Sequence, residues 1–308
     1  MQVADIPERW RPKLWNSASE HFYGVAEAFW DAVQNGLNPD TNRIYLPVFW
    51  SNNYHEQHRR RREPVFRAVP ELQVWLDNNI DPTKEYFTVT RADEGIYEYL
   101  PKNVLVFGAG DNADVVIPLA NSMAYSAPKH RKKHLACFVG VVQCGGPRTP
   151  HGVSPKFSDY DPTGIGTRIR MSMREAASNR GDCLLVDQDG STPEARQTFI
   201  DAMRDSHYAL CPRGYAPTSF RLYEAMALGT VPLYISDRWL MPYADRGEWQ
   251  PTCVRVAPDR VGEALSMAAQ DTFAYMADNI ARLYDSHFSL AGTCQQISRY
   301  LEDARCSV

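Results

Sequence analysis

The sequence lacks the features that mark several large classes of protein. Its seven cysteines are odd in number and include no Cys-x-x-Cys pair, which argues against a zinc ribbon and against a disulfide framework. No apolar run approaches the roughly 20 residues needed to span a bilayer. The segment Met1 to Arg11 has no signal-peptide core, and no Asn-x-Ser/Thr sequon occurs. We therefore expect a soluble, cytoplasmic protein in a reducing compartment.

An excess of charge of one sign is also missing. The chain has 33 Lys plus Arg against 37 Asp plus Glu, a net charge of −4, so it lacks the global electrostatic footprint of a dedicated nucleic-acid or membrane-surface binder. With 44% hydrophobic residues the chain can bury a large core, which excludes a disordered protein. At roughly 100–200 residues per domain, the 308 residues predict two domains.

Short apolar segments alternate with segments of helical periodicity, which predicts open α/β sheets. The predicted strands are residues 44–50, 86–90, 104–107, 114–117, 135–142, 183–186, 208–211, 231–235 and 253–256. The predicted helices are residues 19–35, 64–79, 167–177 and 219–228, a helix that starts at the cap Ser191-Thr192-Pro193-Glu194, and a helical tail over 259–303. The basic, proline-containing stretch 127–134 is interpreted as the interdomain linker.

The most informative stretch is residues 208–235, which reads as a strand, a Pro/Gly loop, a capped helix and a strand. In such units a ligand binds beyond the carboxyl ends of the strands, where the helix N-terminus attracts an anion such as a diphosphate. We expect Arg221 and Glu224 to lie together on the helix face away from the sheet. They form either a surface ion pair or a nucleotide site. Arg221 lies in the first helical turn, where the helix dipole disfavours a cation, and this placement favours a phosphate ligand. Glu224 would then accept hydrogen bonds from ribose hydroxyls.

The loop before this helix offers further donors. Arg213 supplies a second cation and Gly214 permits close approach of the backbone, although both also fit a plain turn after Pro212. Ser219 is predicted to be the helix N-cap, a role that is compatible with binding a phosphate.

These residues resemble the signature of the exostosin family of glycosyltransferases. The resemblance rests on Pro212-Arg213-Gly214-Tyr215, Ser219-x-Arg221-Leu-x-Glu224-Ala225, Gly229-x-Val231-Pro232 and Asp237 before Leu240-x-Pro242. It extends to residues 44–51, to 86–95 with Asp93 and Gly95, to Asp114-Val-Val-Ile-Pro118 and to Phe138-Val-Gly140, and so covers most of the chain.

The resemblance implies a GT-B fold, in which two Rossmann-like domains with parallel sheets face each other across a cleft. It implies an acceptor-binding domain over residues 1–130, a nucleotide-sugar-binding domain over 131–285, and a C-terminal helix over 286–308 that returns to the first domain. Secretory members of the family are membrane-anchored. The unpaired cysteines and missing sequons of this chain contrast with those members, so we expect it to be a soluble relative.

The resemblance also implies transfer of a sugar from a UDP-sugar to a carbohydrate hydroxyl, with inversion and without a required metal or other cofactor. The implied donor-binding residues are Gly140, Arg213, Gly214, Tyr215, Ser219, Arg221 and Glu224. Arg168 and Arg170 on the basic helix are additional candidates, or else belong to a solvated helix face. Asp187-Gln188-Asp189 has the letters of a metal-binding Asp-x-Asp motif, but we interpret it as a polar turn.

Direct displacement needs a base for the acceptor hydroxyl. Asp93 is the leading candidate, because it follows a predicted strand and matches the family's aspartate. The histidine that usually precedes that aspartate is replaced by Ala92 here. Glu94 and the pair His55-Glu56 are the alternatives, and any of these could be an ordinary loop residue.

Two basic clusters, residues 58–62 and 129–134, are interpreted as solvated segments, so no nucleic-acid partner is expected. The third hypothesis is a nucleic-acid-associated protein that uses the run Arg59 to Arg62. The second is a non-catalytic protein of the same fold that binds a nucleotide sugar or a carbohydrate.

Overall fold

The computed structural model describes residues 1–11, 23–54, 67–93, 95–110, 112–127, 132–142, 164–188, 192–214, 216–247 and 250–303. The chain divides into two compact units. Unit 1 comprises residues 1–122, 240–243 and 285–308, and unit 2 comprises residues 123–239 and 244–284. Each unit contains one sheet in which the paired strands are parallel, so the predicted fold class of two Rossmann-like domains, as in the GT-B architecture, is confirmed.

The sheet of unit 2 has the spatial order β7-β6-β8-β9-β10. Its strands are β6 (His134–Val139), β7 (Cys183–Val186), β8 (Ser206–Pro212), β9 (Val231–Ile235) and β10 (Val254–Val256). Counted along the chain this order is 2-1-3-4-5, so the winding direction reverses between β6 and β8. Ligands of such sheets bind outside the carboxyl ends of the strands at this reversal.

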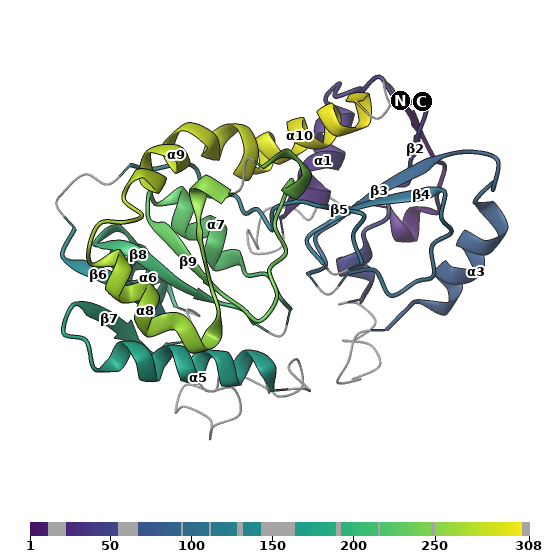
Figure 1. Cartoon of the computed structure of the whole chain (residues 1–308). Helices are drawn as coiled ribbons and strands as arrows, with labels where there is room; N and C mark the ends of the chain where they lie inside the picture. The colour runs from purple at the N-terminus through teal and green to yellow at the C-terminus, as the bar shows by residue number, and fades with distance from the viewer. Residues whose placement is uncertain are drawn as a thin grey trace. The chain divides into compact units, whose positions relative to one another are not determined.

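The described helices of unit 2 are α5 (Ile165–Ser178), α6 (Pro193–Arg204), α7 (Phe220–Ala227), α8 (Val261–Ala268) and α9 (Tyr275–Leu283) (Figure 1). Two of them, α6 and α7, begin at hydroxyl caps. Before α6, the Thr192 hydroxyl accepts the Ala195 N–H at 3.1 Å. Before α7, the Ser219 hydroxyl accepts the Arg221 N–H at 3.3 Å, so the predicted cap is confirmed.

The sheet of unit 1 has its strands in chain order, β1 (Gln2–Val3), β2 (Ile44–Tyr45), β3 (Tyr86–Thr90), β4 (Val104–Gly108) and β5 (Val115–Val116). Successive side chains of a strand point to opposite faces of the sheet. Phe87 and Phe107 therefore share a core with α1 (Val25–Gln34) and with α10 (Leu290–Asp303) of the helical tail. Val106 packs instead with α3 (Pro70–Asn79).

Two elements of unit 1 differ from the prediction. The predicted strand over 44–50 pairs only at Ile44–Tyr45, and residues 50–54 are helical. Pro47 lacks the N–H that would continue the ladder. The helix predicted over 64–79 begins at Pro70, because Val69 is extended, as the residue before a proline usually is. The first part of that prediction lies outside the described residues.

No helix in the described part of the chain has both the length and the apolar character needed to cross a bilayer.

Candidate functional site

The carboxyl ends of β6 and β8 carry a cluster of arginine side chains. Arg221, in the first turn of α7, donates from Nη2 to the carbonyl of Val139 at 2.8 Å. Its guanidinium carbon lies 4.6 Å from the ring centroid of Phe138, a cation–π distance. The Arg221 Nε is buried and has no hydrogen-bond partner among the described residues. We expected Arg221 on the helix face away from the sheet, which is wrong: the side chain folds over the end of β6.

Gly140 makes this placement of Arg221 possible. A Cβ atom at position 140 would lie 2.4 Å from the Arg221 Nη2, and the φ of Gly140 is 153°, a backbone conformation that favours glycine. The absence of a side chain at Gly140, just after β6, therefore leaves the space that the Arg221 guanidinium occupies.

Arg170 joins the loops that follow β6 and β8. It projects from α5, is only 7% exposed, and donates from Nη1 to the Val141 carbonyl at 2.9 Å. Its Nε donates to the Arg213 carbonyl at 3.4 Å. Arg221 and Arg170 therefore bind the backbone carbonyls on either side of Gly140. Arg168, two residues before Arg170, is exposed.

Arg213 follows β8 directly and is also 7% exposed. Its Nη1 donates to Asp237 Oδ1 at 2.6 Å, and its Nε donates to the Gly214 carbonyl at 3.3 Å. Partial burial opposes ionisation of Asp237, but the Arg213 guanidinium holds the pKa of this carboxyl below its ordinary value. Asp237, which lies just beyond β9, thus orients Arg213.

Glu224 lies one turn further along α7. Burial raises the pKa of its carboxyl, while the positive charges of Arg221 and Arg196 oppose that rise. Within the described residues the Glu224 carboxylate accepts no hydrogen bond and forms no ion pair with Arg221, so the surface-ion-pair alternative is wrong. A partly buried carboxylate without a protein donor can accept hydrogen bonds from a ligand hydroxyl.

The structure thus brings most of the predicted donor-binding residues of unit 2 to one edge of its sheet. Tyr215 lies outside the described residues. The described residues contain no group of three His, Cys, Asp or Glu side chains that could hold a metal ion. Asp187, the first residue of the Asp-x-Asp letters, accepts the Val142 N–H at 3.3 Å and pairs with Arg174 at 3.4 Å.

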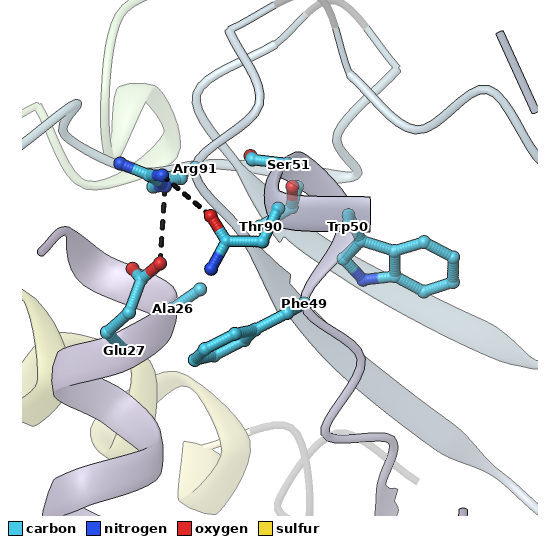
Figure 2. Close-up of a pocket in the computed structure, with 8 residues that line it drawn as sticks. Ala26, Glu27, Phe49, Trp50, Ser51, Thr90 and Arg91 are labelled. Atoms are coloured by element: carbon cyan, nitrogen blue, oxygen red, sulfur yellow. Dashed lines mark hydrogen bonds and ion pairs between the residues drawn. The ribbon is translucent and has the colours of Figure 1, made fainter. Parts of the chain in front are cut away.

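In unit 1, Asp93 lies three residues beyond β3 and is partly buried. His55 and Glu94 lie outside the described residues. A narrow hollow of unit 1 is lined in part by Phe49, Trp50 and Ser51, and Figure 2 shows Glu27 and Arg91, which also line it, paired with each other. Sequence patterns missed this pair. The available signal was a single acid, Glu27, within the apolar run Val25 to Phe29.

The basic residues before β6 depart from expectation. Lys132, predicted in a solvated linker, donates from Nζ to the carbonyls of Ser206 and Gly229, each at 2.9 Å. Burial lowers the pKa of this ammonium to about 8. The cluster over 58–62 and residues 129–131 lie outside the described residues.

Comparison with known proteins identifies the family. The family model of the exostosin GT47 domain matches residues 7–270, which is most of the chain. The chain belongs to the exostosin GT47 family. Its resemblance to the exostosin family of glycosyltransferases is thereby confirmed.

Relatives of this exostosin-family chain include plant and animal proteins. A probable glucuronosyltransferase of Oryza sativa subsp. japonica is 30% identical over 177 residues, covering 55% of this chain and 40% of the relative. A probable β-1,4-xylosyltransferase of Arabidopsis thaliana is 39% identical over 66 residues, covering 21% and 16%. An exostosin-1 homolog of Caenorhabditis elegans is 26% identical over 95 residues, covering 30% and 25%. The chain thus spans less than half of each of these relatives.

Solved structures with weaker likeness include a GtfA/B complex, with a TM-score of 0.42 and 9% identity over 85% of this chain and 53% of that one. The pneumococcal O-GlcNAc transferase GtfA in complex with UDP and GlcNAc has a TM-score of 0.38 and 10% identity over 88% and 59%. The assignment of the fold of this chain is based on the strand order and the parallel strand pairing of its two sheets.

Proposed function

We propose that this chain is an inverting glycosyltransferase that transfers a sugar from a UDP-sugar to a hydroxyl of a carbohydrate acceptor by direct displacement. The observation that carries the proposal is the cluster of Arg170, Arg213 and Arg221 at the reversal between β6 and β8. Guanidinium groups at the carboxyl ends of parallel strands, beside a helix N-terminus, favour a diphosphate.

In this proposal, unit 2 binds the donor. Arg213 and Arg221 offset the negative charge that grows on the departing UDP. Ser219 and the first N–H groups of α7 approach the phosphates. Gly140 and Gly214 let the backbone come close to them. Arg170 holds the two loops in place through its backbone bonds.

Glu224 accepts hydrogen bonds from the ribose hydroxyls, which supply the donors that its carboxylate lacks among the described residues. Arg168 and Tyr215 remain candidate donor-binding residues.

The acceptor is proposed to bind unit 1, where Asp93 takes the proton of the attacking hydroxyl. The oxygen then attacks the anomeric carbon opposite the UDP, the bond to the β-phosphate oxygen breaks, and the configuration inverts. Glu94 and His55 remain the alternative bases. The arginines offset the negative charge of the leaving UDP, so the proposed mechanism requires no metal ion or other cofactor.

The donor site is tested by titrating UDP into the full chain in a calorimeter. Arg221→Ala removes hydrogen bonds to a charged group, each contributing about 1.5–3 kcal/mol, so the UDP Kd is expected to rise roughly 10- to 100-fold. Arg180→Ala is the matched control, because Arg180 pairs with Asp182 just before β7, at the opposite edge of the same sheet. Equal effects of the two substitutions, or no UDP binding by the unmodified chain, would contradict the donor site.

Turnover is tested with a panel of UDP-sugars and oligosaccharide acceptors. UDP-glucuronic acid and UDP-xylose are tried first, because relatives are named as glucuronosyl- and xylosyltransferases. Asp93→Asn is expected to retain UDP binding and lose transfer, and NMR of the product reports whether the anomeric configuration has inverted. UDP binding without transfer across the panel would favour the non-catalytic binding protein instead.

A further inference from the structure

Arg91 joins three segments at the carboxyl edge of the unit 1 sheet. It is the first residue after β3, and its side chain is 10% exposed. Its Nε lies 3.3 Å from Glu27 Oε1, near the start of α1, and its Nη2 donates to Asn52 Oδ1 at 3.0 Å, in the helical turn that follows Phe49 (Figure 2). One guanidinium therefore ties the loop after β3 to both neighbouring segments.

Each carboxylate oxygen of Glu27 makes its own contact. While Oε1 faces Arg91, Oε2 accepts the Gly24 N–H at 3.0 Å and so caps the first turn of α1. Position 24 is also fitted to the arginine, since a Cβ there would lie 2.8 Å from Arg91 Cδ. The Glu27 side chain is only 8% exposed, so its charge depends on Arg91 as its counter-ion.

The loop that Arg91 starts carries Asp93, and its far end is held by backbone contacts and by the Asn112 side chain. The Gly95 N–H donates to the Ala92 carbonyl at 3.0 Å. A Cβ at Gly110 would lie 2.3 Å from the Gly95 nitrogen, so the loop after β4 packs directly on this turn. Beyond it, Asn112 Oδ1 accepts the Ile96 N–H at 3.0 Å.

The near end of the loop is fixed mainly by side chains. The Ala92 N–H donates to the Thr90 hydroxyl at 3.1 Å, and Arg91 makes the contacts to Glu27 and Asn52. A buried ion pair contributes little to stability compared with an apolar pair of similar volume. The hydrogen bonds that Glu27 Oε2 accepts from Gly24 and that Arg91 Nη2 donates to Asn52 are directional and fix one geometry, which is what a reacting group requires from its surroundings.

We propose that the buried Arg91–Glu27 pair is a positioning device for Asp93, holding the loop after β3 so that this carboxylate meets the acceptor hydroxyl. The inference rests on the proposed function, in which Asp93 is the base. Arg91 and Glu27 act through the loop and do not themselves touch the reacting atoms.

The test is the double substitution Glu27→Gln with Arg91→Met in the full chain, which removes both charges together and leaves neither buried alone. The melting temperature and the UDP Kd are expected to stay near those of the unmodified chain, because the arginine cluster belongs to unit 2. Since a misplacement of about 1 Å can cost 10²-fold, kcat is expected to fall roughly 100-fold. The single variant Arg91→Lys keeps the charge opposite Glu27, so its kcat should fall less than that of the double variant. Full kcat in the folded double variant would overturn the inference.

The chain supplies a matched control at the other end of the same strand. Arg43 Nη1 lies 2.8 Å from Glu85 Oε2, just before β3. Removing this pair by Arg43→Met with Glu85→Gln is expected to leave kcat unchanged. An equal loss of kcat in this control would mean that the effect of removing Arg91 and Glu27 comes from general destabilisation of β3. That result would contradict a positioning role.

Hydrogen exchange gives a readout that needs no substrate. Amides of residues 92–96 are expected to exchange faster in the Glu27→Gln, Arg91→Met variant and at an unchanged rate in the control. Unchanged exchange in the double variant would refute the positioning role even with the donor site intact. Conversely, normal turnover by Asp93→Asn would refute the base assignment and, with it, this inference.

Discussion

Gly140 lies against the guanidinium group of Arg221 at the end of β6. Adding one methyl group at this position therefore tests the donor site. Gly140→Ala puts a Cβ 2.4 Å from the Arg221 Nη2 at a φ of 153°. We expect a stability loss of about 1–3 kcal/mol from the backbone conformation and a weaker UDP affinity from the displaced guanidinium. Chemical denaturation measures the stability, and calorimetry measures the affinity.

Gly36→Ala separates these two effects. Gly36 also has a positive φ, of 100°, but nothing lies within contact distance of an added Cβ. This control should lose stability and keep UDP affinity. Unchanged affinity in both variants would show that Arg221 does not depend on Gly140.

At the scale of elements, Lys132 joins strands at the amino edge of the unit 2 sheet. Its Nζ binds the Ser206 carbonyl at the start of β8 and the Gly229 carbonyl before β9. Burial lowers the pKa of Lys132 from 10.5 to about 8. Between these two pH values the unfolded chain therefore binds the proton that the folded chain lacks, and the contribution of Lys132 to stability rises with pH.

The Lys132→Met variant is expected to lose this rise. The difference in free energy of unfolding between the unmodified chain and the variant should shift in favour of the unmodified chain from about pH 8 to pH 10.5, as measured by urea denaturation. Lys133→Met leaves the two bonds of Lys132 in place and should keep the rise. A constant difference across this range would mean that Lys132 does not titrate there.

Elements were predictable from the sequence where their signals are local. The strands at 86–90, 183–186 and 231–235 are short apolar runs with turn residues at their ends, and α6 and α7 begin at hydroxyl caps. The segment 44–50 reads as a strand in the same way, but strand pairing depends on partners that the local pattern does not contain.

The candidate site follows the same rule. Arg213, Ser219, Arg221 and Glu224 lie within one strand-loop-helix unit, so their spacing alone predicts that they gather. The contacts of Arg91 with Glu27 and Asn52, and of Lys132 with Ser206, join residues far apart in the chain. Such contacts follow from the tertiary fold, and a single sequence does not show which residues pair in them.

At the scale of the whole molecule, each unit has its own sheet, and the proposed donor residues all belong to unit 2. UDP at about 100 times its Kd should stabilise the state that binds it by about 2.7 kcal/mol. We expect this to slow amide exchange in the loops after β6 and β8 and in the first turn of α7. The loop over 92–96 in unit 1 should exchange at its former rate. Protection confined to unit 1 would place UDP elsewhere.

The helical tail has a consequence for how the protein is made. Cys294, Ile297 and Leu301 of α10 belong to the same core as Val25 and Phe29 of α1. During synthesis, α1 must therefore wait, with part of its apolar surface uncovered, until α10 has left the ribosome. Unit 2 lies between these two helices along the chain, so its sheet can form first. Unit 1 is then completed after unit 2.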